Sequence, residues 1–289
     1  MKLGNECRSC LFFSQSKKVE NYNAEERDKF ISEIKELCER EEENSASPLL
    51  MRKINLLHQE IFGKSIDYKE EKIKFNSLCL SYENDIYDII LNSSDSLEKA
   101  IQFAIVGNLI DFTKLTSIDM DLLEYFVSKA NEQKLDEEVL SELKKDLSSA
   151  KTITYLLDNC GEIVFDKLLI KTIKKLYPHV TITAVVRGEE IVNDVTYFDS
   201  SFVGLDKVCD VIDNGTNVPG TYLKEISKEC LHQMDSSDVI ISKGLGNFET
   251  LHNECDYNIY YLFLCKCDFF ASMFNVKVWD SVLTREKKI

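Results

Sequence analysis

The sequence predicts an α/β fold in which a helical first half, residues 1–148, precedes a second half, residues 149–289, built on a mainly parallel sheet. After Ala150, helical patterns give way to short apolar runs that alternate with helical stretches. Glycines follow the same division, because three of the ten lie before residue 150 and seven lie between Gly161 and Gly246. Nearly continuous apolar runs are expected where helices cover both faces of a parallel sheet.

The helices of the first half begin at recognisable start signals. These are capping residues or an early proline: Asn23, Ser47-Pro48, Asp67 and Asp95. Gly63 ends the second of these helices, and the third is predicted to run through Ile90. Two more helical patterns begin near Asp119 and near Asp136.

Five strands are predicted in the second half: Ile153–Leu157, Val180–Val186, Val208–Ile212, Val239–Ile241 and Ile259–Leu264. Helical stretches separate them, which predicts right-handed crossovers between parallel strands. A helix over residues 163–176 follows the first strand. In such a sheet, ligands bind in the crevice beyond the carboxyl ends of the strands.

The composition narrows the classes of function. A formal charge of -15 argues against nucleic acid as the main partner. No run of 18 apolar residues is present and residues 1–10 lack the apolar core of a signal peptide, so we expect a cytoplasmic protein without a membrane partner. In a reducing compartment, most of the ten cysteines are expected to be small apolar residues rather than disulfide partners.

Oxygen-bearing side chains follow the first two strands. Asp158 and Asn159 come directly after the first strand, and Asp194 lies in the loop after the second. Carboxylate and amide oxygens suit Mg²⁺ or Mn²⁺ better than Zn²⁺. The four histidines are isolated, which argues against a zinc hydrolase. The residues therefore predict a site at which a divalent cation activates a phosphoryl group.

The fourth strand ends in Lys243-Gly244-Leu245-Gly246. Lys243 would neutralise a phosphate, and the two glycines would let the backbone approach an anion closely. The competing interpretation is structural, because Asp158 and Asn159 are both favoured caps for the helix that follows them. Their placement at successive strand ends favours the functional interpretation.

The segment from Asp158 to Asp166, DNCGEIVFD, resembles the signature of the damage-control phosphatase family, metal-dependent phosphatases long described as a domain of unknown function. The resemblance spans nearly the whole chain. Further matching segments are Ala104–Phe112, Val186-Arg187-Gly188, Asn193–Thr196, Asn214-Gly215, Lys243–Glu249 and Lys266-Cys267. Several motifs in order are more specific than any one of them.

The resemblance implies a helical domain packed on a three-layer α/β/α domain with a Rossmann-like sheet, and hydrolysis of phosphate monoesters of small metabolites such as sugar phosphates, phosphopantetheine derivatives or damaged phosphometabolites. It implies Mg²⁺, Mn²⁺, Co²⁺ or Ni²⁺ as cofactor and a small phosphorylated metabolite as partner, and it leaves the oligomeric state open. The implied metal ligands are Asp158, Asn159 and Asp194; the implied catalytic residues are Asp158, Asp194 and Lys243; the implied substrate-binding residues are Lys243, Gly244, Asn247, Glu162, Arg187 and Asn108, with Asp111 nearby.

The chain departs from the family pattern at three places. Cys160 stands where alanine is usual, Leu245 stands where glutamine is common, and Asp67-Tyr68 lacks an intervening proline. Cys7 and Cys10 resemble the stand-alone, mostly prokaryotic branch of the family. This pair is half of a zinc or redox site, which Cys267 or Cys79 would complete, or it is simply two reduced thiols.

Two other functions remain open at this point. The sheet would also suit a carboxyl methyltransferase that uses S-adenosylmethionine, although no Gly-x-Gly loop follows the first strand. A non-catalytic protein that binds a metal or a metabolite is the third hypothesis, but Lys243 beside a metal set is more than a simple binding pocket needs.

Overall fold

The computed structural model describes residues 4–41, 45–64, 66–109 and 121–286. Its six strands form one sheet in the order β3-β2-β1-β4-β5-β6, parallel except for β6, which runs antiparallel to β5. The strands are β1 (Thr152–Leu156), β2 (Thr181–Val186), β3 (Asp210–Asp213), β4 (Val239–Lys243), β5 (Ile259–Leu264) and β6 (Ser281–Glu286). The predicted α/β class and the five predicted strands are confirmed, and β6 is an additional strand.

The helices before the sheet are α1 (Asn5–Lys18), α2 (Ala24–Arg40), α3 (Ser47–Phe62), α4 (Lys69–Ser81), α5 (Glu83–Leu91), α6 (Ser96–Val106), α7 (Leu122–Glu132) and α8 (Glu137–Ser149). Asn23 and Asp95 accept backbone hydrogen bonds as N-caps, as predicted. The helix predicted to run through Ile90 is instead two helices, because the chain breaks at Tyr82. The signal near Asp119 is Asp121, which caps α7.

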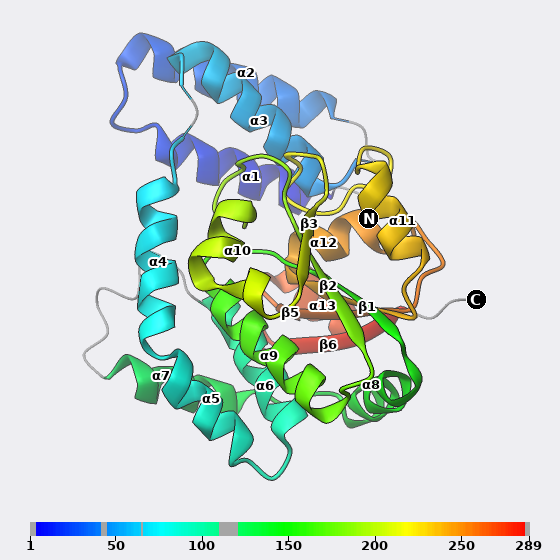
Figure 1. The fold of residues 1–289 in the computed structure, drawn as a ribbon. Coiled ribbons are helices and arrows are strands. Elements are labelled where there is room, and N and C mark those ends of the chain that lie inside the picture. The colour runs from blue at the N-terminus through cyan, green and yellow to red at the C-terminus, as the bar shows by residue number, and fades with distance from the viewer. Residues whose placement is uncertain (1–3, 42–44, 65, 110–120, 287–289) are drawn as a thin grey trace.

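Within the sheet half, the helices are α9 (Glu162–Leu176), α10 (Tyr197–Val203), α11 (Lys228–Asp235), α12 (Gly244–Leu251) and α13 (Asp268–Phe274). Short 3₁₀ helices lie at Gly107–Leu109 (η1) and Leu205–Lys207 (η3). Figure 1 shows the twisted sheet between these helices.

Alternate side chains of the strands enter two different cores, as the two-residue period of a strand requires. Tyr155 packs in a cluster with apolar residues of α6 and α9, whereas Leu156 packs on the opposite face with residues of α11, α12 and α13. The molecule therefore has three layers, helices on both sides of the sheet. Since α6 belongs to the first cluster, helices from before residue 148 cover one face of the sheet directly.

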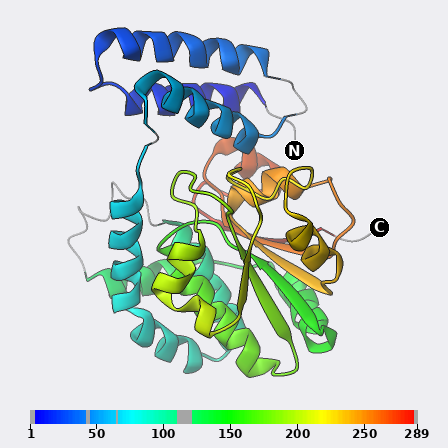
Figure 2. The same cartoon turned by 45° about the horizontal axis from the view of Figure 1, so that its top comes forward.

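Helices α1, α2 and α3 form a third cluster around Phe30, Ile34 and Leu50. Figures 1 and 2 show these helices together at one end of the molecule, with α4 running from them along the sheet half. A bidentate contact from Arg52 on α3 to Glu225 ties this group to the rest of the chain. The division of the chain at residue 148 stays a prediction.

Glu249 on α12 is buried close to Ser47 at the start of α3, and burial raises its pKa to about 7 from 4.5. A raised carboxyl pKa means that the folded state loses stability as the pH rises through this range. We expect Glu249→Gln to be more stable than the wild type by on the order of 3 kcal/mol at pH 8 and similar to it near pH 5, by urea unfolding. A difference that does not change with pH would contradict this expectation.

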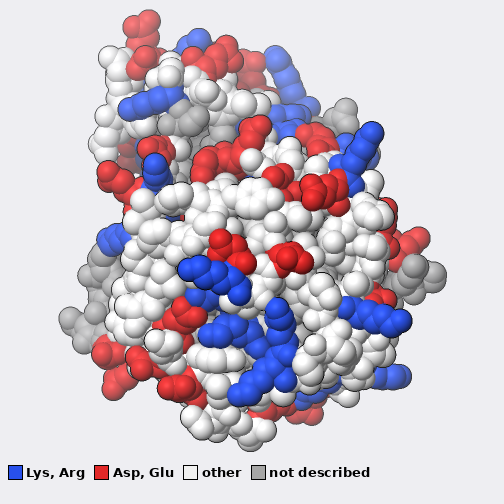
Figure 3. All heavy atoms as spheres, in the orientation of Figure 1, with Lys and Arg blue, Asp and Glu red and all other residues white. Residues whose placement is uncertain are grey.

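Charged side chains of both signs are spread over the face shown in Figure 3, with basic side chains gathered in the region of α9, whose last turn carries Lys174 and Lys175. Within the described ranges, no helix is long and apolar enough to cross a bilayer.

Candidate functional site

The strand order places a topological switch point at β1, which lies between β2 and β4. Chain connections from β1 run toward β2 and β3, whereas β4 and β5 lie on its other side. The crevice beyond the carboxyl ends of β1 and β4 is where ligands bind in sheets of this kind. Asp158 follows β1 and Lys243 ends β4, so both residues lie at this crevice.

The loops after β1 and β2 are paired with each other. The backbone N–H of Val195 donates to Asp158 O at 2.9 Å, and that of Cys160 donates to Asn193 O at 2.9 Å. Asn159 and Asp194 form an isolated antiparallel bridge between these two hydrogen bonds. The structure thus brings together the three residues predicted to bind the metal.

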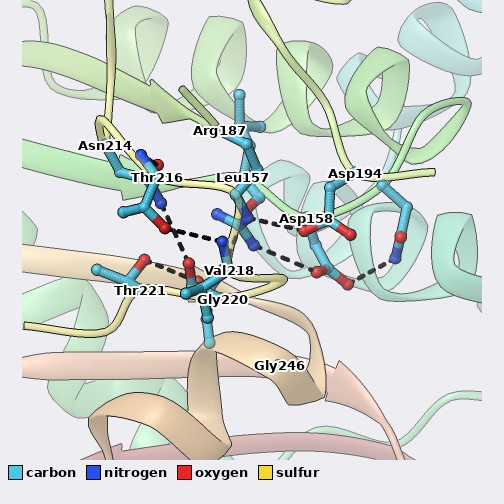
Figure 4. A network of polar contacts seen from close by, with 12 residues as sticks. Leu157, Asp158, Arg187, Asp194, Asn214, Thr216, Val218, Gly220, Thr221 and Gly246 are labelled. Atoms are coloured by element: carbon cyan, nitrogen blue, oxygen red, sulfur yellow. Dashed lines mark hydrogen bonds and ion pairs between the residues drawn. The ribbon is translucent and has the colours of Figure 1, made fainter. Parts of the chain in front are cut away.

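Two buried carboxylates of this site lie beside one guanidinium (Figure 4). Arg187 Nε donates to Asp194 Oδ2 at 2.7 Å, and its Nη2 lies 3.7 Å from Asp158 Oδ1. Burial, reinforced by Asp194 and Glu162, raises the pKa of Asp158 to about 7. Burial also raises the pKa of Asp194, although Arg187 opposes that shift. The raised pKa of each acid indicates that an additional positive charge in the pocket would stabilise the two carboxylates.

The guanidinium of Arg187 has N–H donors that make no hydrogen bond to the described residues. Its side chain is fully buried, yet among the described residues neither Nη1 nor Nη2 has a hydrogen-bond partner. An unpaired buried donor is costly, so such groups mark places where a ligand or an ordered water binds. Nη2 lies beside the carboxylate of Asp158 (Figure 4).

Two side-chain amide groups contact the second carboxylate oxygen of Asp158, Oδ2. Asn108 in η1 donates to Glu162 Oε2 at 2.6 Å and to Asp158 Oδ2 at 3.2 Å. Asn159 donates to the same Asp158 oxygen at 2.6 Å. These contacts place Asn108 and Glu162 at the site, and their contact with substrate stays a prediction. Asp111, also predicted nearby, lies outside the described residues.

Lys243 is fully buried beneath Glu162. Its ammonium contacts Glu162 Oε1, Asp166 Oδ1 at 2.7 Å and Ala104 O at 2.8 Å. Burial lowers the pKa of Lys243, but the two carboxylates more than offset it, so the pKa lies above its usual range. Burial raises the pKa of Asp166 to about 7. Direct contact of Lys243 with a substrate phosphate stays a prediction, since all three of its N–H groups have acceptors here.

Asn247 also has every polar group engaged. Its Nδ2 donates to Leu157 O at 3.0 Å and Lys243 O at 2.8 Å, and its Oδ1 accepts from Thr221 Oγ1 at 2.8 Å. These bonds fix the ends of β1 and β4 relative to each other. Its contact with substrate stays a prediction.

The loop after β3 supports the same edge (Figure 4). Asn214 accepts from the backbone N–H groups of Gly188 and Thr216, each at 3.1 Å, and donates to Gly220 O at 3.1 Å. A Cβ on Gly246 would lie 2.3 Å from Pro219 O. The second glycine after Lys243 therefore admits this loop rather than an anion.

Gly244 has a φ of +75°, and a Cβ added there would lie 1.9 Å from Asp158 Oδ2. We expect Gly244→Ala to displace the Asp158 carboxylate and to weaken Mn²⁺ binding by at least about 10-fold, as judged by calorimetry. Gly63→Ala is a matched control, because Gly63 has a φ of +67° with nothing within 4 Å of the added Cβ. Equal Mn²⁺ binding by both variants would contradict the expectation.

The donors at this site fit a hard divalent cation, because Asp158, Asp194 and Asn159 offer oxygens and the two acids share one guanidinium, that of Arg187. Across the described residues, no group of three or more His, Cys, Asp or Glu is arranged to hold a metal, and Asn159 as the third ligand stays a prediction. Cys7 is half-buried and Cys10 exposed. Burial raises the pKa of the Cys7 thiol, and a metal or redox site there stays a prediction.

A cavity of about 520 Å³ lies between α3, the start of α4 and the loop that precedes Asp194. Glu190, Ile191 and Asn217 line it, together with Tyr68 and Phe198. Ile191 O accepts from the backbone N–H of Asp194 at 3.1 Å, so one wall of the cavity is continuous with the site.

Sequence reasoning assigned no role to several residues that complete this arrangement. They are Tyr155, Asp166, Lys72, Asn76 and Asp199. The spacing of Glu162 and Asp166, one helical turn apart at the start of α9, is a signal that could have identified the second acid. The others are joined only by the fold.

Three kinds of comparison relate this chain to known proteins: to a family, to individual sequences and to a solved structure. Residues 4–282 match the damage-control phosphatase ARMT1-like domain. The chain is 33% identical to an uncharacterised protein of Methanocaldococcus jannaschii, over 99% of this chain and 96% of that protein, and 31% identical to a damage-control phosphatase of Pyrococcus horikoshii, over 99% of each. A crystal structure of a DUF89 family protein from Pyrococcus horikoshii matches with a TM-score of 0.83 and 30% identity, over 99% of this chain and 100% of that one.

Proposed function

Because the chain belongs to the damage-control phosphatase ARMT1-like family, we propose that it is a metal-dependent phosphatase that hydrolyses phosphate monoesters of small metabolites. Two similar proteins, from Pyrococcus horikoshii and Archaeoglobus fulgidus, bear the name damage-control phosphatase, which supports a phosphatase role. The observation that carries the proposal is the buried Arg187, which lies beside two acids of raised pKa and whose Nη groups have no hydrogen-bond partner among the described residues.

In this proposal, Asp158, Asn159 and Asp194 hold a Mg²⁺, Mn²⁺, Co²⁺ or Ni²⁺ ion. The ion would supply Lewis acidity toward a phosphoryl oxygen and toward water. Arg187 is already oriented by Asp194, and its Nη groups bind phosphoryl oxygens in the forked geometry that guanidinium groups favour. Glu162 and Asn108 keep the Asp158 carboxylate in position.

The organic part of the substrate occupies the cavity of about 520 Å³. That volume suits a small metabolite. Charged, amide, aromatic and aliphatic side chains line the cavity, which supports a ligand with both polar and apolar parts, such as a sugar phosphate or a phosphopantetheine derivative.

The test is hydrolysis of an aryl phosphate and of a panel of phosphorylated metabolites by the purified protein, with each of the four metal ions in turn. We expect activity that a chelator abolishes and that one of these ions restores. Absence of turnover with every ion and every phosphate ester would refute the proposal.

A further inference from the structure

Helix α4 places two buried polar side chains against the site from the helical half of the chain. Lys72 and Asn76 are four residues apart, so they lie on the same face of the helix. Their side chains are 1% and 0% exposed, respectively. Polar groups buried this completely need specific partners. The partners here lie in the two loops of the candidate metal site and in α10, which follows the second loop.

Asn76 holds the loop that follows β1. Its Oδ1 accepts from the backbone N–H of Gly161 at 2.7 Å. Gly161 comes two residues after Asn159 and has a φ of +73°, which turns the chain from the strand end into α9. The other end of the Asn76 amide donates to Asp199 Oδ1 at 2.9 Å.

Asp199 and Lys72 hold the loop that follows β2. Asp199 Oδ2 accepts from the backbone N–H of Thr196 at 2.9 Å, two residues after Asp194, and Lys72 Nζ lies 2.7 Å from the same oxygen. Lys72 also donates to Glu190 Oε2 at 2.7 Å. Burial lowers the pKa of Lys72, but Asp199 and Glu190 outweigh it and raise the pKa above its usual range.

We infer that Asn76, assisted by Lys72 and Asp199, is a positioning residue that fixes the spacing of Asn159 and Asp194 for the metal ion. This inference rests on the proposed metal dependence. Phe75 and Cys79 of α4 already pack in the core of the sheet half, so the attachment of α4 does not need a buried ion pair and its desolvation cost. The polar network instead contacts one backbone N–H on each metal-binding loop, and outer partners of this kind tune metal affinity.

The variant Asn76→Leu keeps the number of side-chain heavy atoms but removes both hydrogen bonds. We expect its Mn²⁺ affinity, measured by calorimetry, to fall about 10- to 100-fold. Gln102→Leu is the matched control, because Gln102 is a buried amide on α6 that donates to Gln133 O at 3.0 Å away from the site. Both variants should lose stability, but only Asn76→Leu should lose Mn²⁺ affinity.

Exchanging the side chains at positions 76 and 199 tests whether Mn²⁺ affinity can be restored. In Asn76→Asp the new carboxylate faces Asp199, so Mn²⁺ binding at pH 8 should weaken. The double variant Asn76→Asp with Asp199→Asn exchanges the two groups and removes this repulsion. It should restore Mn²⁺ affinity to within about 3-fold of the wild type. This contrast decides the matter even if Asn76→Leu does not fold. Wild-type Mn²⁺ affinity in folded Asn76→Leu, or equal affinity in Asn76→Asp and the double variant, would overturn the inference. Absence of Mn²⁺ binding by the wild type would instead refute the proposed metal dependence on which it rests.

Discussion

We expect Asp158→Asn to lower kcat/KM for a phosphate monoester by at least about 1,000-fold, which corresponds to about 4 kcal/mol of transition-state stabilisation. The physical reason is the loss of a carboxylate from a proposed three-donor metal site. The variant should remain folded at pH 8, because burial raises the pKa of Asp158 to about 7 and the charged form is therefore unfavourable in the folded protein without metal. Steady-state kinetics and urea unfolding, measured on the same preparation, separate the two effects.

Asp210→Asn is the control for this experiment. Asp210 is exposed at the beginning of β3, so the same change of charge occurs at the opposite end of the strands from the site. It should leave kcat/KM within about 2-fold and stability within about 0.5 kcal/mol of the wild type. Full activity in Asp158→Asn would show that this carboxylate has no part in the reaction.

We expect Lys243→Met to destabilise the fold by about 3–5 kcal/mol, because it leaves the buried carboxylates of Glu162 and Asp166 without their shared ammonium. The loss should grow as the pH rises, since burial raises the pKa of Asp166 and the variant leaves its charged form without this ammonium. Unfolding by urea at pH 6 and pH 8 measures the effect.

Lys175→Met, an exposed position in the last turn of α9, is the control and should change stability by no more than about 0.5 kcal/mol. Adding Glu162→Gln and Asp166→Asn to Lys243→Met removes the buried charges and should recover much of the stability. If Lys243→Met unfolds at the same urea concentration as Lys175→Met, the buried ion pairs are not important for stability.

The gathering of the site residues could be predicted because it follows from strand order. Asp158, Asp194 and Lys243 end or follow β1, β2 and β4, and these three strands are neighbours in the sheet. Carboxyl ends of neighbouring parallel strands meet at one edge, so polar residues after them must lie close together. The helix caps at Asn23 and Asp95 were also predictable, because a helix cap is a local signal in the sequence.

The direction of a side chain and long-range contacts could not be predicted in this way. The position of Lys243 at a strand end predicts contact with a phosphate. In the structure its ammonium contacts Glu162 and Asp166, which a separate helix supplies. Asn76 is 85 residues from Gly161 in the chain, and no periodicity or motif connects them. The break at Tyr82 and the antiparallel strand β6 likewise depend on packing rather than on local signals.

The central claim is that one divalent ion binds between the loops after β1 and β2. Anomalous X-ray scattering at the manganese edge, from crystals soaked in Mn²⁺, tests it most directly. We predict one strong peak per chain within coordination distance of Asp158, Asn159 and Asp194, about 2.0–2.3 Å from their oxygens, and its disappearance in Asp158→Asn. A peak elsewhere in the molecule, or no peak between these residues at saturating Mn²⁺, would contradict the claim.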